Sequence, residues 1–237
     1  MSKRFTALFF SLLVIVNLYF TVKVEPHELK TQVDKLLALF LFQFDYFLLF
    51  VYIFSKLLRN FHKSLLVLAA CYACLFILGM ASFYITDEKQ FDIVYSYSQP
   101  ILRLLLIIVF YWMGLRFYFL RDKVSLTFYA IAMVEGFYLL FLLNRYPRAL
   151  MYSFNIYWLV VLLFFVIGIQ VRINFKNRRL LFLIGILFTF TADLYYILPP
   201  EERVFEFTYI IIRLINTIGE FLIVNHVLRY YNSIFKK

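Results

Sequence analysis

The sequence predicts an all-α, polytopic membrane protein: a transmembrane bundle of eight spanning helices with both termini in the cytoplasm. Hydrophobic residues make up 64% of the 237 positions and the mean hydropathy is +0.83, whereas charged residues make up only 16%. The apolar residues gather in runs long enough to cross a bilayer, and the basic residues stand in short clusters between the runs. Because the connecting segments are short, residues 1–237 are expected to form a single integral-membrane domain.

The predicted spans follow from the length of the apolar runs, since about 20 residues cross the hydrocarbon core. Lys3 and Arg4 precede the first run and no small-residue cleavage motif follows it, so this run is expected to be an uncleaved anchor. The last run is the least apolar, but placing it on the membrane surface would leave the basic tail outside. In order, the spans are residues 5–22, 36–55, 64–85, 98–119, 124–144, 149–171, 180–198 and 204–226.

The charges between the spans predict the orientation of the bundle. Alternate segments are basic, and the segments between them are mixed or acidic, as an even number of spans requires; Arg145 and Arg148 are the exceptions. Cytoplasmic segments carry the excess of Lys and Arg. The basic set is therefore expected in the cytoplasm: Lys3, Arg4, Lys56, Arg59, Lys63, Arg116, Arg121, Lys123, Arg172, Lys176, Arg178, Arg179, Arg229, Lys236 and Lys237.

The prolines and glycines predict unbroken helices. Every proline falls in a predicted loop or in the first turn of a span, including Pro100, which ends the longest predicted loop, residues 86–100. The six glycines form no GxxxG pair. Transporters built on broken helices usually carry Gly or Pro in mid-span, so this pattern does not favour that class.

Ionisable side chains inside the spans are the main candidates for function, because each is expensive to place in a bilayer. Most lie in the outer half of their predicted spans, where a shared cluster of acids and arginines would compensate their charges. They are Asp45, Arg103, Glu135, Asp193, Arg213 and Glu220.

The last span carries a polar stripe. Arg213, Asn216, Thr217 and Glu220 recur at i, i+3, i+4 and i+7, which places them on one helical face. That face should look into the bundle or into a water-filled cavity. His226 follows near the inner interface, where a surface position is the favoured interpretation. The same buried charges also have a purely structural interpretation, in which they only lock the helix register.

Several other functions are disfavoured by the sequence. The net charge of +10 is spread through loops rather than gathered in a basic domain, so no nucleic-acid partner is expected. Cys71 and Cys74 stand among small residues suited to helix packing. The three histidines lie on different sides or at different depths, so neither a zinc site nor another metal or cofactor is expected. Walker, HExxH, GxSxG and kinase signatures are absent.

Two neighbouring segments resemble known membrane proteins. Residues 185–197 read GILFTFTADLYYI, with a Gly and a membrane-embedded Asp, and residues 209–223 read YIIIRLINTIGEFLI. Together they resemble the last two helices of the YhhN/lysoplasmalogenase-type family, which also has eight helices and an intramembrane aspartate. That resemblance implies a lipid-acting hydrolase, although the family's first-half Gly-Asp motif and early Lys-Pro are missing here. Residues 185–197 are also similar to ADLLY-type helices of bacterial multi-helix sensory domains.

Three classes of function remain open. The first, which the unbroken helices and aromatic-rich surface favour, is a binding or sensing protein or a small subunit of a membrane complex; its candidate ligand-binding residues are Arg213, Asn216, Arg103 and Asp45. The second is a membrane-embedded lipid hydrolase, with Asp193, Glu220 and Glu135 as candidate catalytic acids and bases. The third is a proton- or ion-coupled carrier. The expected partners are membrane lipids and a protein partner or second copy, and the expected location is a bacterial cytoplasmic (inner) membrane.

Overall fold

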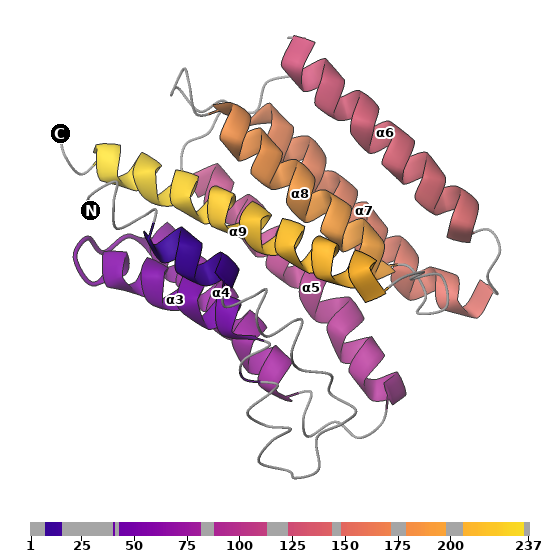
Figure 1. The fold of residues 1–237 in the computed structure, drawn as a ribbon, viewed down its shortest axis with the longest axis horizontal. Coiled ribbons are helices and arrows are strands. Elements are labelled where there is room, and N and C mark those ends of the chain that lie inside the picture. The colour runs from indigo at the N-terminus through magenta and orange to yellow at the C-terminus, as the bar shows by residue number, and fades with distance from the viewer. Residues whose placement is uncertain are drawn as a thin grey trace. The chain divides into compact units, whose positions relative to one another are not determined.

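Helices make up most of the described part of the chain, and no strand occurs within it. The structure, a computed structural model, describes residues 8–15, 40, 43–81, 88–112, 123–143, 148–171, 179–197 and 206–234. Residues 8–15 are helical, and the helices labelled in Figure 1 follow: α3 (Phe44–Leu57), α4 (Lys63–Ala81), α5 (Glu88–Trp112), α6 (Lys123–Leu143), α7 (Arg148–Gln170), α8 (Arg179–Ile197) and α9 (Glu206–Ile234).

Three helices begin and end within one residue of their predicted positions. The helices predicted over residues 124–144, 149–171 and 180–198 are α6, α7 and α8. The helix predicted over residues 64–85 is α4, which is described as far as Ala81. The first two predicted spans lie partly outside the described residues, of which α3 begins at Phe44.

Helix α5 corrects the prediction of a loop over residues 86–100. It begins at Glu88 and contains Pro100 in its interior, so the expectation that no proline lies inside a helix is wrong. In the sequence, Phe91, Val94 and Tyr95 follow the helical spacing i, i+3, i+4. Proline removes one backbone hydrogen bond, and the surrounding helical pattern outweighs that loss here.

Helix α9 also exceeds its prediction. It continues to Ile234, eight residues past the predicted end at 226, because buried Val227, Leu228 and Tyr231 extend its inner face. His226 therefore lies inside a packed helix and is only 3% exposed, so its expected surface position is wrong. Its Nδ1 lies 2.9 Å from the Leu222 carbonyl oxygen, and its ring lies against that of Phe182.

The chain divides into two compact units, Met1–Asp92 and Ile93–Lys237. In the first unit α3 packs against α4, and Phe9 stacks on Tyr52 with ring centroids 4.8 Å apart. Cys71 is buried in this packing, whereas Cys74 is exposed. The buried side chains of this pair of helices include Leu49, Ile53, Leu65, Leu68 and Tyr72.

A histidine caps the first turn of α4. The Ser64 amide donates a hydrogen bond to His62 Nδ1 at 3.2 Å, which satisfies one of the free amides at the helix start. Only a neutral imidazole can accept at this nitrogen. Burial, with the neighbouring Lys63 charge, lowers the pKa of His62 and keeps its ring in that state.

In the second unit α8 is the shared neighbour, because it packs against α6, α7 and α9. Gly168 on α7 gives room to Ile186 on α8, since a Cβ at Gly168 would lie 2.8 Å from the Ile186 side chain. On α5, Phe110 stacks with Phe164 of α7 and meets Phe182 of α8 edge-on. Aromatic rings thus fill the spaces between these helices.

Two helices of the described chain are long and apolar enough to cross a membrane. They are the segments Lys63–Ala81 and Ile210–Ser233. Shorter apolar helical segments occur at Pro100–Trp112 and Ile156–Gln170. Length and composition therefore give weak support for membrane association.

Candidate functional site

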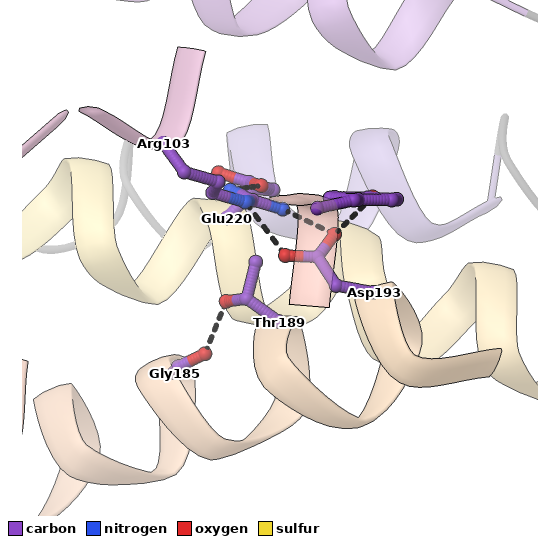
Figure 2. Close-up of polar contacts among 6 residues, drawn as sticks. Arg103, Gly185, Thr189, Asp193 and Glu220 are labelled. Atoms are coloured by element: carbon purple, nitrogen blue, oxygen red, sulfur yellow. Dashed lines mark hydrogen bonds and ion pairs between the residues drawn. The ribbon is translucent and has the colours of Figure 1, made fainter. Parts of the chain in front are cut away.

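Helices α8 and α9 come into close backbone contact at two glycines, Gly185 and Gly219. A Cβ on Gly219 would lie 2.9 Å from the Gly185 carbonyl oxygen and 3.0 Å from the Thr189 amide nitrogen, so the two backbones touch here. The Thr189 hydroxyl donates to the Gly185 carbonyl oxygen at 2.5 Å (Figure 2). The sequence offered no GxxxG signal because the two glycines belong to different helices.

Two carboxylates lie beside this contact. Gly185, Thr189 and Asp193 stand at i, i+4 and i+8 on one face of α8, and Glu220 follows Gly219 directly on α9. Helices α8 and α9 run antiparallel (Figure 1), and helical side chains lean toward the N-terminus of their own helix. The two carboxylates therefore lean toward each other.

Arg103 of α5 joins both carboxylates (Figure 2). Its Nε donates to Asp193 Oδ2 at 2.7 Å, and one terminal nitrogen donates to Asp193 Oδ1 at 2.9 Å. The other terminal nitrogen donates to Glu220 Oε1 at 2.5 Å. The paired contact with Asp193 is the geometry in which a guanidinium binds a carboxylate most strongly. We call Arg103, Asp193 and Glu220 the charged trio.

Helix α7 closes the charged trio from another side. The Tyr157 hydroxyl lies 3.4 Å from Asp193 Oδ1, and the Arg103 guanidinium carbon lies 5.2 Å from the centroid of the Phe164 ring. Arg103 is 4% exposed and both acids are 2% exposed. Four helices therefore enclose three charges in nearly water-free surroundings, where electrostatic interactions are strong.

The formal charges of the trio sum to −1, since one arginine faces two acids. An arginine stays protonated in proteins, so the trio is balanced when it gains one positive charge. That charge can come from a proton, from a bound cationic group or from a neighbouring basic side chain. Arg213 is such a neighbour, two turns before Glu220 on the same helical face.

The remaining predicted residues lie in different places. Arg213 and Asn216 are buried on α9, at 6% and 5% exposed. Asp45 lies in the first unit, near the start of α3, where one of its carboxylate oxygens accepts the Tyr46 amide at 3.0 Å. Glu135 on α6 contacts Thr191 on α8. The trio thus joins three of the six ionisable residues, and the other assignments remain predictions.

Sequence reasoning missed the residues that surround the charges. Tyr157 and Phe164 lie one above the other on α7 at i and i+7, but their aromatic side chains are ordinary in so aromatic a chain. Thr191 carried no signal either, because threonine is common in apolar helices. The only usable hint was the helical spacing of Gly185, Thr189 and Asp193.

Neither a metal site nor a known relative assigns a function to the described residues. Among the residues that the structure describes, no group of three His, Cys, Asp or Glu side chains is arranged to hold a metal ion. No family model, curated protein or solved structure matches the chain.

Proposed function

We propose that the chain is an integral protein of a bacterial cytoplasmic membrane, with eight spans and both termini in the cytoplasm. Two described helices have the required length and apolar character. Along the described part of α6, six large apolar side chains are more than half exposed: Leu126, Met133, Val134, Phe137, Tyr138 and Phe141. Such a surface is unusual for a soluble monomer but suits contact with lipid.

Cysteine accessibility tests this arrangement. In a background with Cys71 and Cys74 replaced by serine, Asn60→Cys marks a segment predicted inside and Tyr146→Cys a segment predicted outside. A membrane-impermeant maleimide applied to intact cells should label position 146, and should label position 60 only after the cells are opened. Labelling of both positions in intact cells would contradict the predicted orientation.

We infer further that the protein binds or senses a ligand or partner through the charged trio. The observation that carries this proposal is the attachment of Arg103 to two acids from two other helices. Because three charges are buried together, losing one partner leaves a strongly unfavourable buried charge. Arrangements with one unpaired buried charge are therefore avoided, which leaves two discrete states, with Arg103 either paired or released. A bound group can shift the balance between these two states.

The charge sum suggests the kind of group that is bound. With formal charges summing to −1, the trio gains stability from a proton, from the neighbouring Arg213 or from a cationic group supplied by a ligand or partner, and a ligand of this kind would compete with Arg213. Hydrolysis is less well supported, because Arg103 already holds both oxygens of Asp193. A catalytic Asp193 would first have to break that paired contact before it could reach a substrate.

Hydrogen exchange of α5 tests the sensing proposal. In purified protein in lipid nanodiscs, the protection factors of the backbone amides at residues 101–112, which are corrected for the intrinsic pH dependence of exchange, should rise when the pH falls or when guanidinium or methylammonium is added. Glu220→Gln makes the trio neutral while leaving Arg103 paired with Asp193, so this variant should no longer respond. Asp193→Asn replaces the carboxylate that accepts two hydrogen bonds from Arg103, so exchange at α5 should be faster under all of these conditions.

Glu135→Gln serves as the matched control, since Glu135 lies outside the trio and its replacement should change neither result. If the wild-type protection factors at α5 are the same under all these conditions, the trio is a structural lock and the sensing proposal fails.

A further inference from the structure

Helix α6 carries a second charged site, separate from the trio. Its buried stripe is narrow and mostly made of small side chains, Ser125, Ala132 and Gly136, together with Phe128. At one end of this stripe Arg179 of α8 donates to the Ser125 hydroxyl at 2.6 Å. Helices α6 and α8 therefore meet along a seam, and most other α6 side chains are exposed.

Glu135 lies on the edge of that seam. Both of its carboxyl oxygens are 3.2 Å from the Thr191 hydroxyl oxygen of α8. The side chain is partly buried, and its neighbours Val134 and Tyr138 are 70% and 63% exposed. The carboxyl group thus reaches both a polar partner inside the bundle and the apolar outer surface.

The Glu135 site and the trio occupy different faces of α8. Thr191 and Asp193 are two residues apart, which separates them by about 200° around a helix. Thr191 contacts α6, whereas Asp193 contacts Arg103 of α5. Changes at one site can therefore be tested without altering the contacts of the other.

The partner of Glu135 permits two protonation states. A hydroxyl can donate to an ionised carboxylate, and it can equally accept a hydrogen bond from a neutral carboxyl group. Arg103, by contrast, can only donate. The Glu135–Thr191 pair is therefore satisfied with or without a proton, and without a further partner helix.

We propose that Glu135 and Thr191 form a proton-binding site that opens to the lipid at the α6–α8 seam. Twelve residues of α6 precede Glu135 and eight follow it, which places the carboxyl about 18 Å and 12 Å from the helix ends. Lipid headgroups do not reach that depth. The inference rests on the membrane placement proposed above, but not on any role of the trio.

Labelling with dicyclohexylcarbodiimide, a lipophilic reagent, tests this site in native membranes. The carboxyl proton moves to one carbodiimide nitrogen while a carboxyl oxygen bonds to the central carbon, and the adduct rearranges to a stable N-acylurea. Peptide mass spectrometry should find this adduct on Glu135 and not on the paired acids Asp193 and Glu220. The adduct should be lost in Glu135→Gln and should decrease as the pH rises.

The hydroxyl partner has its own test. In Thr191→Val the ionised carboxylate loses its donor, so labelling should persist to higher pH than in the wild type. Thr191→Ser keeps the hydroxyl and should leave the pH profile unchanged. Identical profiles for all three proteins would overturn the role of Thr191.

Other outcomes identify which premise fails. Val134→Glu, made together with Glu135→Gln, places a carboxyl on the exposed face without the Thr191 partner. If this control is labelled and wild-type Glu135 is not, the proton site is wrong. If neither is labelled, or if a water-soluble carbodiimide labels Glu135 equally well, the membrane placement is wrong. Protection of Glu135 by sodium ions would show that the site takes a metal cation instead of a proton.

Discussion

Replacing Arg103 by methionine leaves Asp193 and Glu220 facing each other without the guanidinium that joins them. The change removes three charge-assisted hydrogen bonds, at 2.7, 2.9 and 2.5 Å. Each such bond contributes about 1.5–3 kcal/mol, so their sum sets an upper limit near 5–9 kcal/mol. Protonation of the stranded acids and local relaxation recover part of this loss. We therefore expect the variant to lose about 3–5 kcal/mol, as is typical when one partner of a buried ion pair is removed.

Equilibrium unfolding in mixed detergent micelles measures this loss, with the fluorescence of Trp112 and Trp158 as the signal. The matched control replaces the whole trio: Arg103→Met, Asp193→Leu and Glu220→Met. Because an apolar set of similar size carries no desolvation penalty, the triple variant should recover to within about 1 kcal/mol of the wild type. Arg103→Lys should fall between the two, since one ammonium group cannot reproduce the paired contact with Asp193.

The result that refutes this reasoning is a small loss in Arg103→Met, below about 1 kcal/mol, together with a larger loss in the triple variant. The three side chains would then stabilise the fold by their shape and not by their charge.

Three further predictions concern backbone and capping features. Gly219→Ala forces the α8 and α9 backbones apart and should lower the free energy of unfolding by about 1–3 kcal/mol. Gly136→Ala is the control, because its Cβ would meet its nearest neighbour only at 3.9 Å. In the same unfolding assay it should be neutral or stabilise the protein by about 0.5–1 kcal/mol. The lowered pKa of His62 means that the unfolded chain takes up its proton first as the pH falls, so the protection factors of the amides in the first turn of α4 should be smaller at about pH 5.5 than at about pH 7.5. His62→Asn, a cap that does not titrate, should remove this difference in protection, and its persistence would contradict the capping role. Pro100→Ala restores a backbone hydrogen-bond donor inside α5 and should raise the free energy of unfolding by up to about 3 kcal/mol. Backbone amide exchange near position 100 should slow as well. A destabilised variant would show that α5 requires the proline.

The ends of several helices were predictable because single residues mark them. Helices α6, α7 and α8 each begin beside a basic residue at the edge of an apolar run, and their predicted ends differ from the structure by one residue. The prediction misses the start of α5 because a proline usually marks a helix boundary, although the helical spacing of Phe91, Val94 and Tyr95 favours a longer helix. The local rule that a helix ends at a proline was wrong here, because the helical pattern continues on both sides of Pro100.

The site was predictable in its members but not in its pairing. Arg103, Asp193 and Glu220 stood out because charge is costly in an apolar helix. Whether Asp193 and Glu220 come together depends on the axial position of α8 relative to α9. The contact of Gly185 with Gly219 sets that position. A contact between two helices leaves no spacing pattern in either one. For the same reason, the sequence grouped Glu135 with the other acids, whereas α6 places it against Thr191.

The touching backbones at Gly185 and Gly219 also restrict how anything reaches the charged trio. Side-chain rotation cannot open a path where main-chain atoms are already in contact, so the α8–α9 side is closed at that level. A ligand would therefore approach from the α5 or α7 side, where side chains and not main-chain atoms border the trio. Its association rate should level off at high ligand concentration, at the rate with which these side chains move aside. The glycine contact thus makes the speed of a response a property of the protein and not of its ligand.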